Sequence, residues 1–268
     1  MPEGRRPLLY LALLVVVALP IWLLSGRLGV IGALRIPTSD LALAFSPMAV
    51  AIGLSVGEGG WRGGLRLLSR SASLRGFGGN LWSLWTVLIP PAIYLASALV
   101  VDGLGLGKPH LAPDPLRLAG LSILFLALAA GEEIGWTGYA LPGLQRRWGP
   151  IAAALILAGP WWVGHLPSMV EIGATPADMA WWAIGAVALR LIICWLYNGT
   201  GASVLAIIVF HALLNLSRIA IVPAVGAHYV TAYQACADLL FAVLAGAAVI
   251  FTRGRLAQSR VSAPGQAD

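Results

Sequence analysis

The sequence GEEIGWTGY, residues 131–139, places two adjacent carboxylates, Glu132 and Glu133, near the end of an apolar run from Leu116 to Leu141. This run is long enough to cross a bilayer as a helix. An ionised side chain at the centre of a spanning helix costs about 2.5 to 3.5 kcal/mol even on lenient insertion scales. Acids at that depth therefore indicate a functional site, and the remaining spans can be interpreted by the groups they place beside it.

The composition is that of a membrane protein. Hydrophobic residues make up 59% of the 268 residues and charged residues only 10%, and the mean hydropathy is +0.85. These values exclude a water-soluble globular domain. We expect an all-α, polytopic transmembrane helical bundle of about eight spans. The segments long and apolar enough to cross a bilayer are residues 7–24, 40–56, 81–101, 116–141, 151–170, 180–197, 202–222 and 229–251.

One domain accounts for nearly the whole chain. Residues 1–252 are predicted to form a single integral membrane domain with a motif-bearing core at about 116–217, and residues 253–268 a polar, disordered cytoplasmic tail.

Residues 58–80 are rich in glycine, arginine and interleaved leucine, which predicts a short amphipathic helix at the membrane surface. Tryptophans near the predicted span ends indicate an aromatic belt: Trp82, Trp85, Trp148, Trp181, Trp182 and Trp195.

The net charge of +6 is distributed unevenly between the loops. With the N-terminus inside, the inner segments carry Arg5, Arg6, Arg62, Arg66, Arg70, Arg75, Arg146, Arg147, Arg253, Arg255 and Arg260, and the outer segments carry Arg27, Arg35, Lys108 and Arg117. This asymmetry follows the positive-inside rule and predicts that both termini lie in the cytoplasm, below a bacterial-type plasma membrane. The cations therefore indicate a lipid bilayer as the partner, and no nucleic acid is expected. The sequence leaves the oligomeric state open.

Two motifs of soluble enzymes do not fit their surroundings. GLSVG at residues 53–57 has the spacing of a nucleophile elbow, but it ends an apolar span and does not follow a strand. GLGLGK at residues 103–108 resembles a phosphate-binding loop, but no strand precedes it and Pro109 prevents the helix that should follow. Cys194 and Cys236 lie inside predicted spans, so neither a disulfide framework nor a cysteine metal site is expected.

Few polar groups remain at membrane depth: Glu132, Glu133, His165, Arg190, His211, Asn215, Arg218 and Asp238. The two glutamates lie roughly 13 Å from the inner end of their span, and His211 lies roughly 15 Å from the inner end of its own. His165 comes out slightly further toward the outside, and Pro167 is predicted to terminate or kink its helix. His211 and Asn215 share a helix face at i and i+4, as Trp161 and His165 do, so we expect them to line one cavity.

These residue types suit the hydrolysis of an amide. Two adjacent carboxylates in a low-dielectric site cannot both ionise cheaply, so we expect one base and one acid there. His165 can orient a water molecule or move a proton, and His211 with Asn215 can donate hydrogen bonds to a developing oxyanion. The same residues allow a second assembly, a catalytic zinc held by Glu132, His165 and His211. No cofactor is expected in the first assembly, and zinc is the cofactor of the second.

Three motifs occur in order on three predicted spans: Glu132-Glu133, Trp161-x-x-x-His165 and His211-x-x-x-Asn215. They resemble the motifs of the CPBP intramembrane proteases, which group type II CAAX prenyl endopeptidases with bacteriocin-processing and abortive-infection proteins. The resemblance covers about residues 116–217. It implies a glutamic endopeptidase in which Glu132 activates water with His165 and Glu133 assists. His211 with Asn215 would form the oxyanion site, and Trp161 is a supporting residue.

One position departs from the family pattern. The first motif of the family is E-E-x-x-x-R, and Thr137 stands at its last position. An arginine there would lie one helical turn from Glu133, at i+4. Either Glu133 stays protonated or another cation replaces that arginine. Arg190, roughly 15 Å into the sixth span, is the candidate, because a buried arginine needs an anion. Asp238 is the competing partner for it, and the threonine also leaves open a weakened activity.

We therefore expect an intramembrane endopeptidase that hydrolyses membrane-associated, prenylated or leader-type peptides. A zinc-dependent version of the same hydrolysis is the nearest alternative. From other classes, the buried acids and histidines could serve a proton-linked transporter or a non-catalytic immunity or scaffold protein. Many transporters consist of inverted repeats, and no such repeat is visible in this sequence. The identity of the peptide substrate does not follow from the sequence.

Overall fold

The structure, a computed structural model, describes residues 6–31, 36–77, 81–108, 114–221, 224–225, 228–229 and 231–257. Its helices are α1 (Pro7–Leu28), α2 (Thr38–Ser71), α3 (Leu81–Gly103), α4 (Pro115–Glu133), the π-helix η1 (Ile134–Ala140), α5 (Leu141–Glu171), α6 (Pro176–Gly199), α7 (Val204–Ile221) and α8 (Thr231–Phe251). The strands form two short hairpins, β1 (Val30–Ile31) with β2 (Ile36–Pro37) and β3 (Ala224–Val225) with β4 (His228–Tyr229). The predicted all-helical fold class is confirmed.

Seven helical segments in the described residues are long and apolar enough to cross a membrane. The predicted number of about eight is close to this value, because one segment, Pro115–Glu171, contains two of the predicted spans in 57 residues. Within it α4 passes into η1 and then α5 without an extended loop. Gly149 interrupts α5 with a φ of 79° and a ψ of 171°, and separates residues 141–148 from 150–171. The predicted boundary between the fourth and fifth spans is therefore a helix break.

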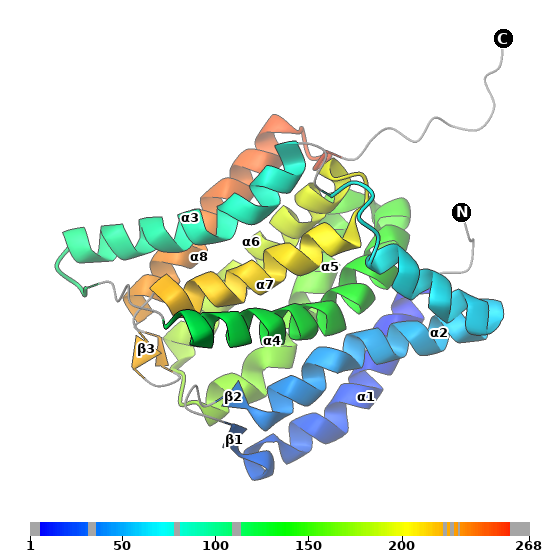
Figure 1. Cartoon of the computed structure of the whole chain (residues 1–268), viewed down its shortest axis with the longest axis horizontal. Helices are drawn as coiled ribbons and strands as arrows, with labels where there is room; N and C mark the ends of the chain where they lie inside the picture. Colours follow the sequence, from blue (N-terminus) through cyan, green and yellow to red (C-terminus); the bar gives the residue numbers. More distant parts are fainter. Residues whose placement is uncertain are drawn as a thin grey trace.

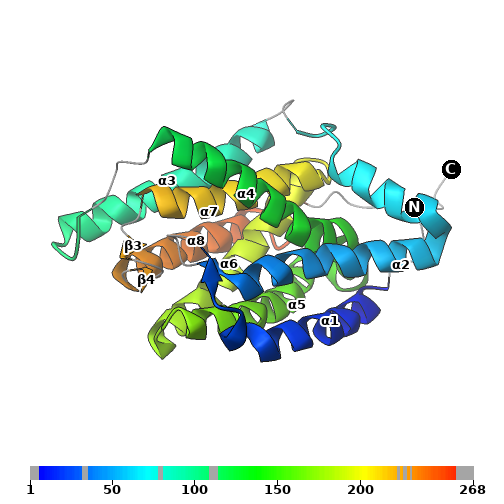
Figure 2. The same ribbon diagram turned by 60° about the horizontal axis from the view of Figure 1, so that its bottom comes forward.

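The helices that carry the predicted site are neighbours in the middle of the bundle. α4 packs against α7 and α2, while α6 packs against α5 and α8. Both views place α1 beside α2 at one side of the molecule and α4 beside α7 (Figure 1, Figure 2). The carboxylates of α4 and the histidine of α7 therefore come from adjacent elements, as the matching depths in the sequence had indicated.

The two ends of the bundle are fixed by hydrogen bonds between turns. At one end, Asn198 donates from its amide nitrogen to Gln145 Oε1 and to the Leu256 carbonyl, at 3.0 Å each. At the other end, the Thr231 hydroxyl donates to Asp178 Oδ1 at 2.7 Å. We call these the Asn198 end and the Asp178 end. α6 and α8 both begin at the Asp178 end, so these two packed helices run in the same direction.

The start of the predicted tail is ordered. Leu256 has no exposed surface, and its carbonyl accepts the hydrogen bond from Asn198. The prediction of a disordered tail from Arg253 is therefore wrong for residues 253–257, because this apolar side chain packs against the bundle. Residues 258–268 lie outside the described residues.

The predicted surface helix is present as the second half of α2. Gly59 and Gly60 leave helical geometry, with Gly60 at a φ of 61°, and a second helical stretch follows to Ser71. Its Trp61 and Leu65 side chains are 72% and 50% exposed, beside exposed arginines. Apolar and cationic side chains together on an outer surface are typical of a helix at a membrane interface. The helix is confirmed up to residue 71, and its place at the interface stays a prediction.

A first prediction concerns the close contact between η1 and α2. A Cβ at Gly135 would lie 2.3 Å from the Pro47 carbonyl oxygen, whereas a Cβ at Gly120 would meet no atom within 4 Å. We expect Gly135→Ala to lower the free energy of unfolding by about 1 to 3 kcal/mol through overpacking, and Gly120→Ala to leave it unchanged or slightly raised. Thermal unfolding in detergent, followed by tryptophan fluorescence, measures both. Equal melting temperatures for the two variants would contradict the packing described.

Candidate active site

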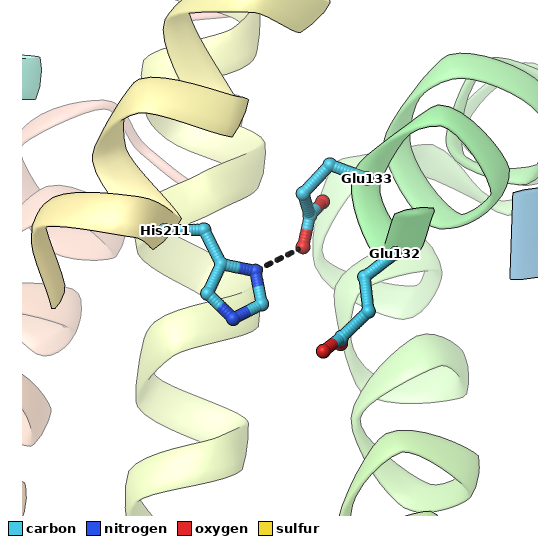
Figure 3. A group of neighbouring side chains, drawn as sticks. All are labelled: Glu132, Glu133 and His211. Carbon is cyan, nitrogen blue, oxygen red and sulfur yellow. Dashed lines mark hydrogen bonds and ion pairs between the residues drawn. The ribbon is translucent and has the colours of Figure 1, made fainter. Parts of the chain in front are cut away.

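Glu133 has no exposed surface and is the centre of a polar network that joins α4, α6 and α7. Both of its carboxylate oxygens accept a hydrogen bond from Arg190 Nη1 at 3.2 Å. Its Oε1 also lies 3.0 Å from His211 Nδ1, as Figure 3 shows. A buried carboxylate with a cation and an imidazole around it is an ion pair with further hydrogen bonds, the form in which buried charges are tolerated.

Thr137 completes this network from η1. Its hydroxyl donates to Glu133 Oε2 at 2.5 Å. Single π-helical turns are rare and occur often at functional sites. Arg190 thus pairs with Glu133, the partner expected for the arginine that the family pattern has at position 137. Thr137 adds a neutral hydrogen-bond donor to the same carboxylate. Asp238, the competing partner, instead accepts two hydrogen bonds from Gln234 Nε2, at 2.9 and 2.8 Å.

The guanidinium of Arg190 is held between aromatic rings. It lies 4.1 Å from the ring centroid of Trp161 and 5.5 Å from that of Trp136. Its Nε and Nη2 atoms are buried and have no hydrogen-bond partner among the described residues. Ring faces attract a cation more strongly when water is excluded, so the two tryptophans stabilise a charge whose ion-pair partner among the described residues is Glu133.

Glu132 points toward a different set of groups from its neighbour. The indole Nε1 of Trp161 donates to Glu132 Oε2 at 2.7 Å. Figure 3 shows the Glu132 carboxylate separate from that of Glu133, on the side of the second ring nitrogen of His211. Unlike Glu133, Glu132 is only half-buried. It is thus the acid of the pair that a ligand can reach, held in place by one indole donor.

His165 is oriented by its own helix. Its Nδ1 lies 2.8 Å from the Trp161 carbonyl, and a carbonyl can only accept, so Nδ1 carries the proton. In the neutral ring Nε2 is then the free acceptor. The Ser168 hydroxyl donates to the His165 carbonyl at 2.8 Å. The prediction that Pro167 terminates this helix is wrong, because α5 continues through it to Glu171. A kink at Pro167 stays a prediction.

A cavity of about 160 Å³ connects these groups. At its inner part it is lined by Glu132, Trp161, His165, His211 and Asn215, five of the predicted site residues. A polar space of this size holds several water molecules. The predicted site residues Glu133, Arg190 and Thr137 do not line it, and contact it only through His211 and Trp161.

One residue of the cavity wall had been given a different role in the sequence analysis. Trp182 of α6, predicted as part of an aromatic belt, packs its ring 5.1 Å from Trp161 and 5.5 Å from His165, measured between centroids. Its indole Nε1 is buried and has no hydrogen-bond partner among the described residues. The sequence did contain a sign of this position. Trp182 lies four residues after Asp178 and eight residues before Arg190, the spacing of residues on one side of a helix.

Three side chains of the site lie close enough together to hold a divalent cation. Glu132, Glu133 and His211 offer three ligand atoms within 4.8 Å of one another, and His165, a member of the predicted zinc set, is not in this group. The Glu133 oxygens already accept from Arg190 and Thr137. A divalent cation on Glu133 would meet a guanidinium 3.2 Å from the same oxygens. Arg190 therefore occupies Glu133, whereas the predicted zinc ligands Glu132, His165 and His211 all line the cavity.

The fold and this arrangement define a class: a polytopic helical membrane protein with a buried glutamate and histidine site. Residues 114–217 match the model of the family described as Rce1-like, type II CAAX prenyl endopeptidase. Over 106 residues the chain is 28% identical to the CAAX prenyl protease 2 of Methanococcus maripaludis, in an alignment that covers 36% of this chain and 39% of the relative.

The chain thus spans about two fifths of the length of the curated relative that it matches. The matched segment contains α4, η1, α5, α6 and most of α7, and with them every residue of the network and the inner part of the cavity. The two comparisons show that this segment is similar to type II CAAX prenyl endopeptidases, in agreement with the resemblance found from the three motifs.

A second prediction concerns the indole of Trp161. Phenylalanine at this position keeps an aromatic ring beside Arg190 and the two histidines but removes the donor to Glu132. Because a hydrogen bond to a charged group contributes about 1.5 to 3 kcal/mol, we expect Trp161→Phe to lower kcat/KM about tenfold or more, with a smaller change in the melting temperature. Trp162→Phe, which removes a donor to the Met179 carbonyl outside the network, is the matched control. Equal loss in both variants would assign Trp161 a packing role alone.

Proposed function

We propose that the protein is an intramembrane endopeptidase that hydrolyses peptide bonds of membrane-associated peptides with water activated by Glu132. The observation that carries the proposal is the position of Glu132: a half-buried carboxylate at the inner part of a polar cavity, held by Trp161 Nε1 at 2.7 Å. That bond occupies Oε2 and leaves Oε1 for a water molecule. His165 offers an unprotonated Nε2 in the same cavity, so a water between them meets two acceptors.

In the proposed reaction, the water oxygen bonds to the peptide carbonyl carbon while one of its protons passes to Glu132. The carbonyl oxygen becomes an oxyanion, which Asn215 Nδ2 would stabilise from one face of α7 together with Nε2–H of His211 in its doubly protonated form, since His211 Nδ1 donates to Glu133. The C–N bond then breaks, and Glu132 returns the proton to the leaving amine nitrogen. The products are a new carboxyl terminus and a new amino terminus, and Glu132 is again a carboxylate.

Glu133 has a supporting role in this proposal. Its Oε1 contact with Nδ1 fixes the orientation of the His211 ring, and Arg190 compensates its charge. The pair of adjacent glutamates therefore divides into one acid that faces the cavity and one that is fixed behind it. A carboxylate that positions a catalytic imidazole through one ring nitrogen is a recurrent arrangement in hydrolases.

The substrate class follows from the location of the site. The cavity lies among helices that are apolar on their outer surfaces, so the scissile bond would be hydrolysed at membrane depth. Peptides that are themselves membrane-associated, such as prenylated or leader-type peptides, reach that depth. The proposal requires the bilayer as a partner and no nucleic acid.

A comparison of peptide termini tests the proposal. Membranes from cells that express the wild type or Glu132→Gln are digested, and the new amino termini are identified by mass spectrometry. We expect a set of termini that is present with the wild type and absent with Glu132→Gln at equal protein abundance. Identical sets would overturn the proposal and favour a scaffold or immunity role. Proton uptake coupled to solute transport, abolished by the same substitution, would favour a transporter.

A third prediction concerns metal removal. Because the proposed reaction activates water with Glu132 and uses no metal, we expect dialysis against a chelator to leave kcat/KM unchanged within a factor of about two and elemental analysis to find no stoichiometric zinc. A zinc endopeptidase treated in parallel is the control for the chelator. Activity that is lost with the metal and restored by zinc would instead support the zinc-dependent alternative.

A further inference from the structure

The two ends of the bundle carry opposite charges. The Asn198 end and its neighbouring turns carry Arg6, Arg62, Arg66, Arg70, Arg75, Arg146, Arg147, Arg253 and Arg255. The Asp178 end carries Asp40, Asp102, Asp114, Glu171 and Asp178, together with Arg27, Lys108 and Arg117. Within the part of the chain that the structure describes, the acid nearest the Asn198 end is Glu58, which accepts from the Tyr139 hydroxyl.

Contacts between turns confirm which loops share an end. A Cβ at Gly76, between α2 and α3, would meet the Thr200 carbonyl at 2.2 Å, so this arginine-bearing loop lies beside the turn after α6. A Cβ at Gly107, after α3, would meet the Tyr233 hydroxyl at 2.9 Å, at the start of α8. Because arginine and lysine accumulate on the cytoplasmic side of membrane proteins, this distribution predicts that the Asn198 end is the cytoplasmic end and the Asp178 end the outer one.

The cavity extends from the site toward the Asp178 end. Beyond Glu132 its wall consists of Met169 and Ile172 at the end of α5, Ala174 in the following loop, and Asp178 in the first turn of α6. Three further wall residues come from the same end of other helices: Asp40, Arg218 and Gln234. Among the described residues that line the cavity, none belongs to a turn at the Asn198 end.

The approach from the opposite end is closed by packed side chains. Tyr139 and Leu144 are 1% and 0% exposed, and Trp136 is 4% exposed, all between the network and the Asn198 end. Gln145 is buried there as well and accepts from Asn198. A peptide that came from this end would have to displace the hydrophobic core, which is packed as tightly as an organic crystal.

We infer that the cavity opens to the extracytoplasmic side of the membrane and admits peptide segments from there. If the protein is the endopeptidase proposed above, on which this step rests, its substrates are leader peptides of exported proteins or outer segments of membrane proteins. This narrows the substrate class proposed above, because a prenylated carboxyl terminus that remains on the inner leaflet would not reach Glu132. The orientation itself does not depend on the proposed activity.

Cysteine labelling tests the orientation without any need for activity. In a Cys236→Ala background Cys194 is fully buried and stays unreactive. Ala174→Cys places a thiol at the mouth of the cavity, and Ser69→Cys places an exposed thiol on the second half of α2, at the Asn198 end. Intact cells are treated with a membrane-impermeant maleimide, and a second sample is permeabilised first. Labelling under denaturing conditions confirms that each thiol is present.

We expect Ala174→Cys to be labelled in intact cells and Ser69→Cys to be labelled only after permeabilisation. The reverse pattern would overturn the inference, because the mouth would then face the cytoplasm. A thiol at position 174 that is unreactive in both samples would also overturn it, because the cavity would not be open to water. Ala177→Cys, an exposed position in the first turn of α6, is a second mouth variant if Ala174→Cys does not accumulate.

A second experiment separates the substrate class from the activity. A peptide whose Glu132-dependent cleavage has been found by terminal mass spectrometry is attached to a single-span carrier, on either its outer or its inner side. Cleavage of the outer peptide alone is expected. Glu132-dependent cleavage of the inner peptide alone would overturn the substrate inference while the protease proposal stands. No Glu132-dependent cleavage of either would contradict the protease proposal, and the labelling pattern would still decide the orientation.

Discussion

Arg190→Gln is expected to lower the free energy of unfolding by about 3 to 5 kcal/mol, because it leaves the Glu133 carboxylate buried without a cation. Arg190 is 1% exposed and Glu133 has no exposed surface, so water cannot replace the guanidinium. The same substitution should abolish cleavage, since Glu133 orients His211. Chemical or thermal unfolding in detergent measures the first effect, and peptide hydrolysis by protein that remains folded at low temperature measures the second.

A double-mutant cycle distinguishes loss of the ion pair from loss of packing. Glu133→Gln combined with Arg190→Gln removes both charges, so this variant should be more stable than Arg190→Gln alone, with a coupling energy of about 1 to 3 kcal/mol. Arg117→Gln, at an exposed position of α4, is the control and should change stability by less than about 0.5 kcal/mol. Additive effects of the two single substitutions would contradict the pairing of Arg190 with Glu133.

Glu132→Gln is expected to lower kcat/KM by about 10² to 10⁴, the usual contribution of a general base. The amide is nearly isosteric with the carboxylate and its oxygen can still accept from Trp161 Nε1, so the melting temperature should change little. Glu171→Gln, near the outer mouth of the cavity and outside the network, is the matched control and should retain activity. Initial rates on a cleaved peptide, with both variants at equal purity and stability, provide the measurement.

The outcome also separates the two glutamates. If Glu132→Gln retained full activity while Glu133→Gln lost it without loss of stability, the assigned roles would be reversed. The structure argues against that reversal, because Glu133 has no exposed surface and its oxygens are occupied by Arg190 and Thr137.

Much of this arrangement could be predicted from the sequence because the membrane restricts what a polar residue can do. Charged and imidazole side chains at membrane depth are few, and matching depths on three spans brought Glu132, His165 and His211 to one level. A buried cation without an anion is costly, so the sequence alone predicted that Arg190 pairs with an acid. The choice between Glu133 and Asp238 required the structure, since hydropathy gives depth but not the rotation of one helix against another.

Other features depend on local geometry that a hydrophobic pattern does not encode. Residues 134–140 form a π-helix, and a run of apolar and small residues there is compatible with α- and π-geometry alike. Pro167 was expected to end or kink α5, but the helix continues through it to Glu171. Trp182 was taken for a belt residue because its distance from a span end does not report the direction of its ring.

The most direct test of the central claim is hydrolysis in water enriched in oxygen-18. Purified wild type and Glu132→Gln are incubated in detergent with a peptide that carries a site found in the terminal comparison, and the products are analysed by mass spectrometry. If Glu132 activates the attacking water, we expect oxygen-18 in the new carboxyl terminus with the wild type and intact peptide with Glu132→Gln. Intact peptide with both proteins, or equal amounts of labelled product with both, would contradict it.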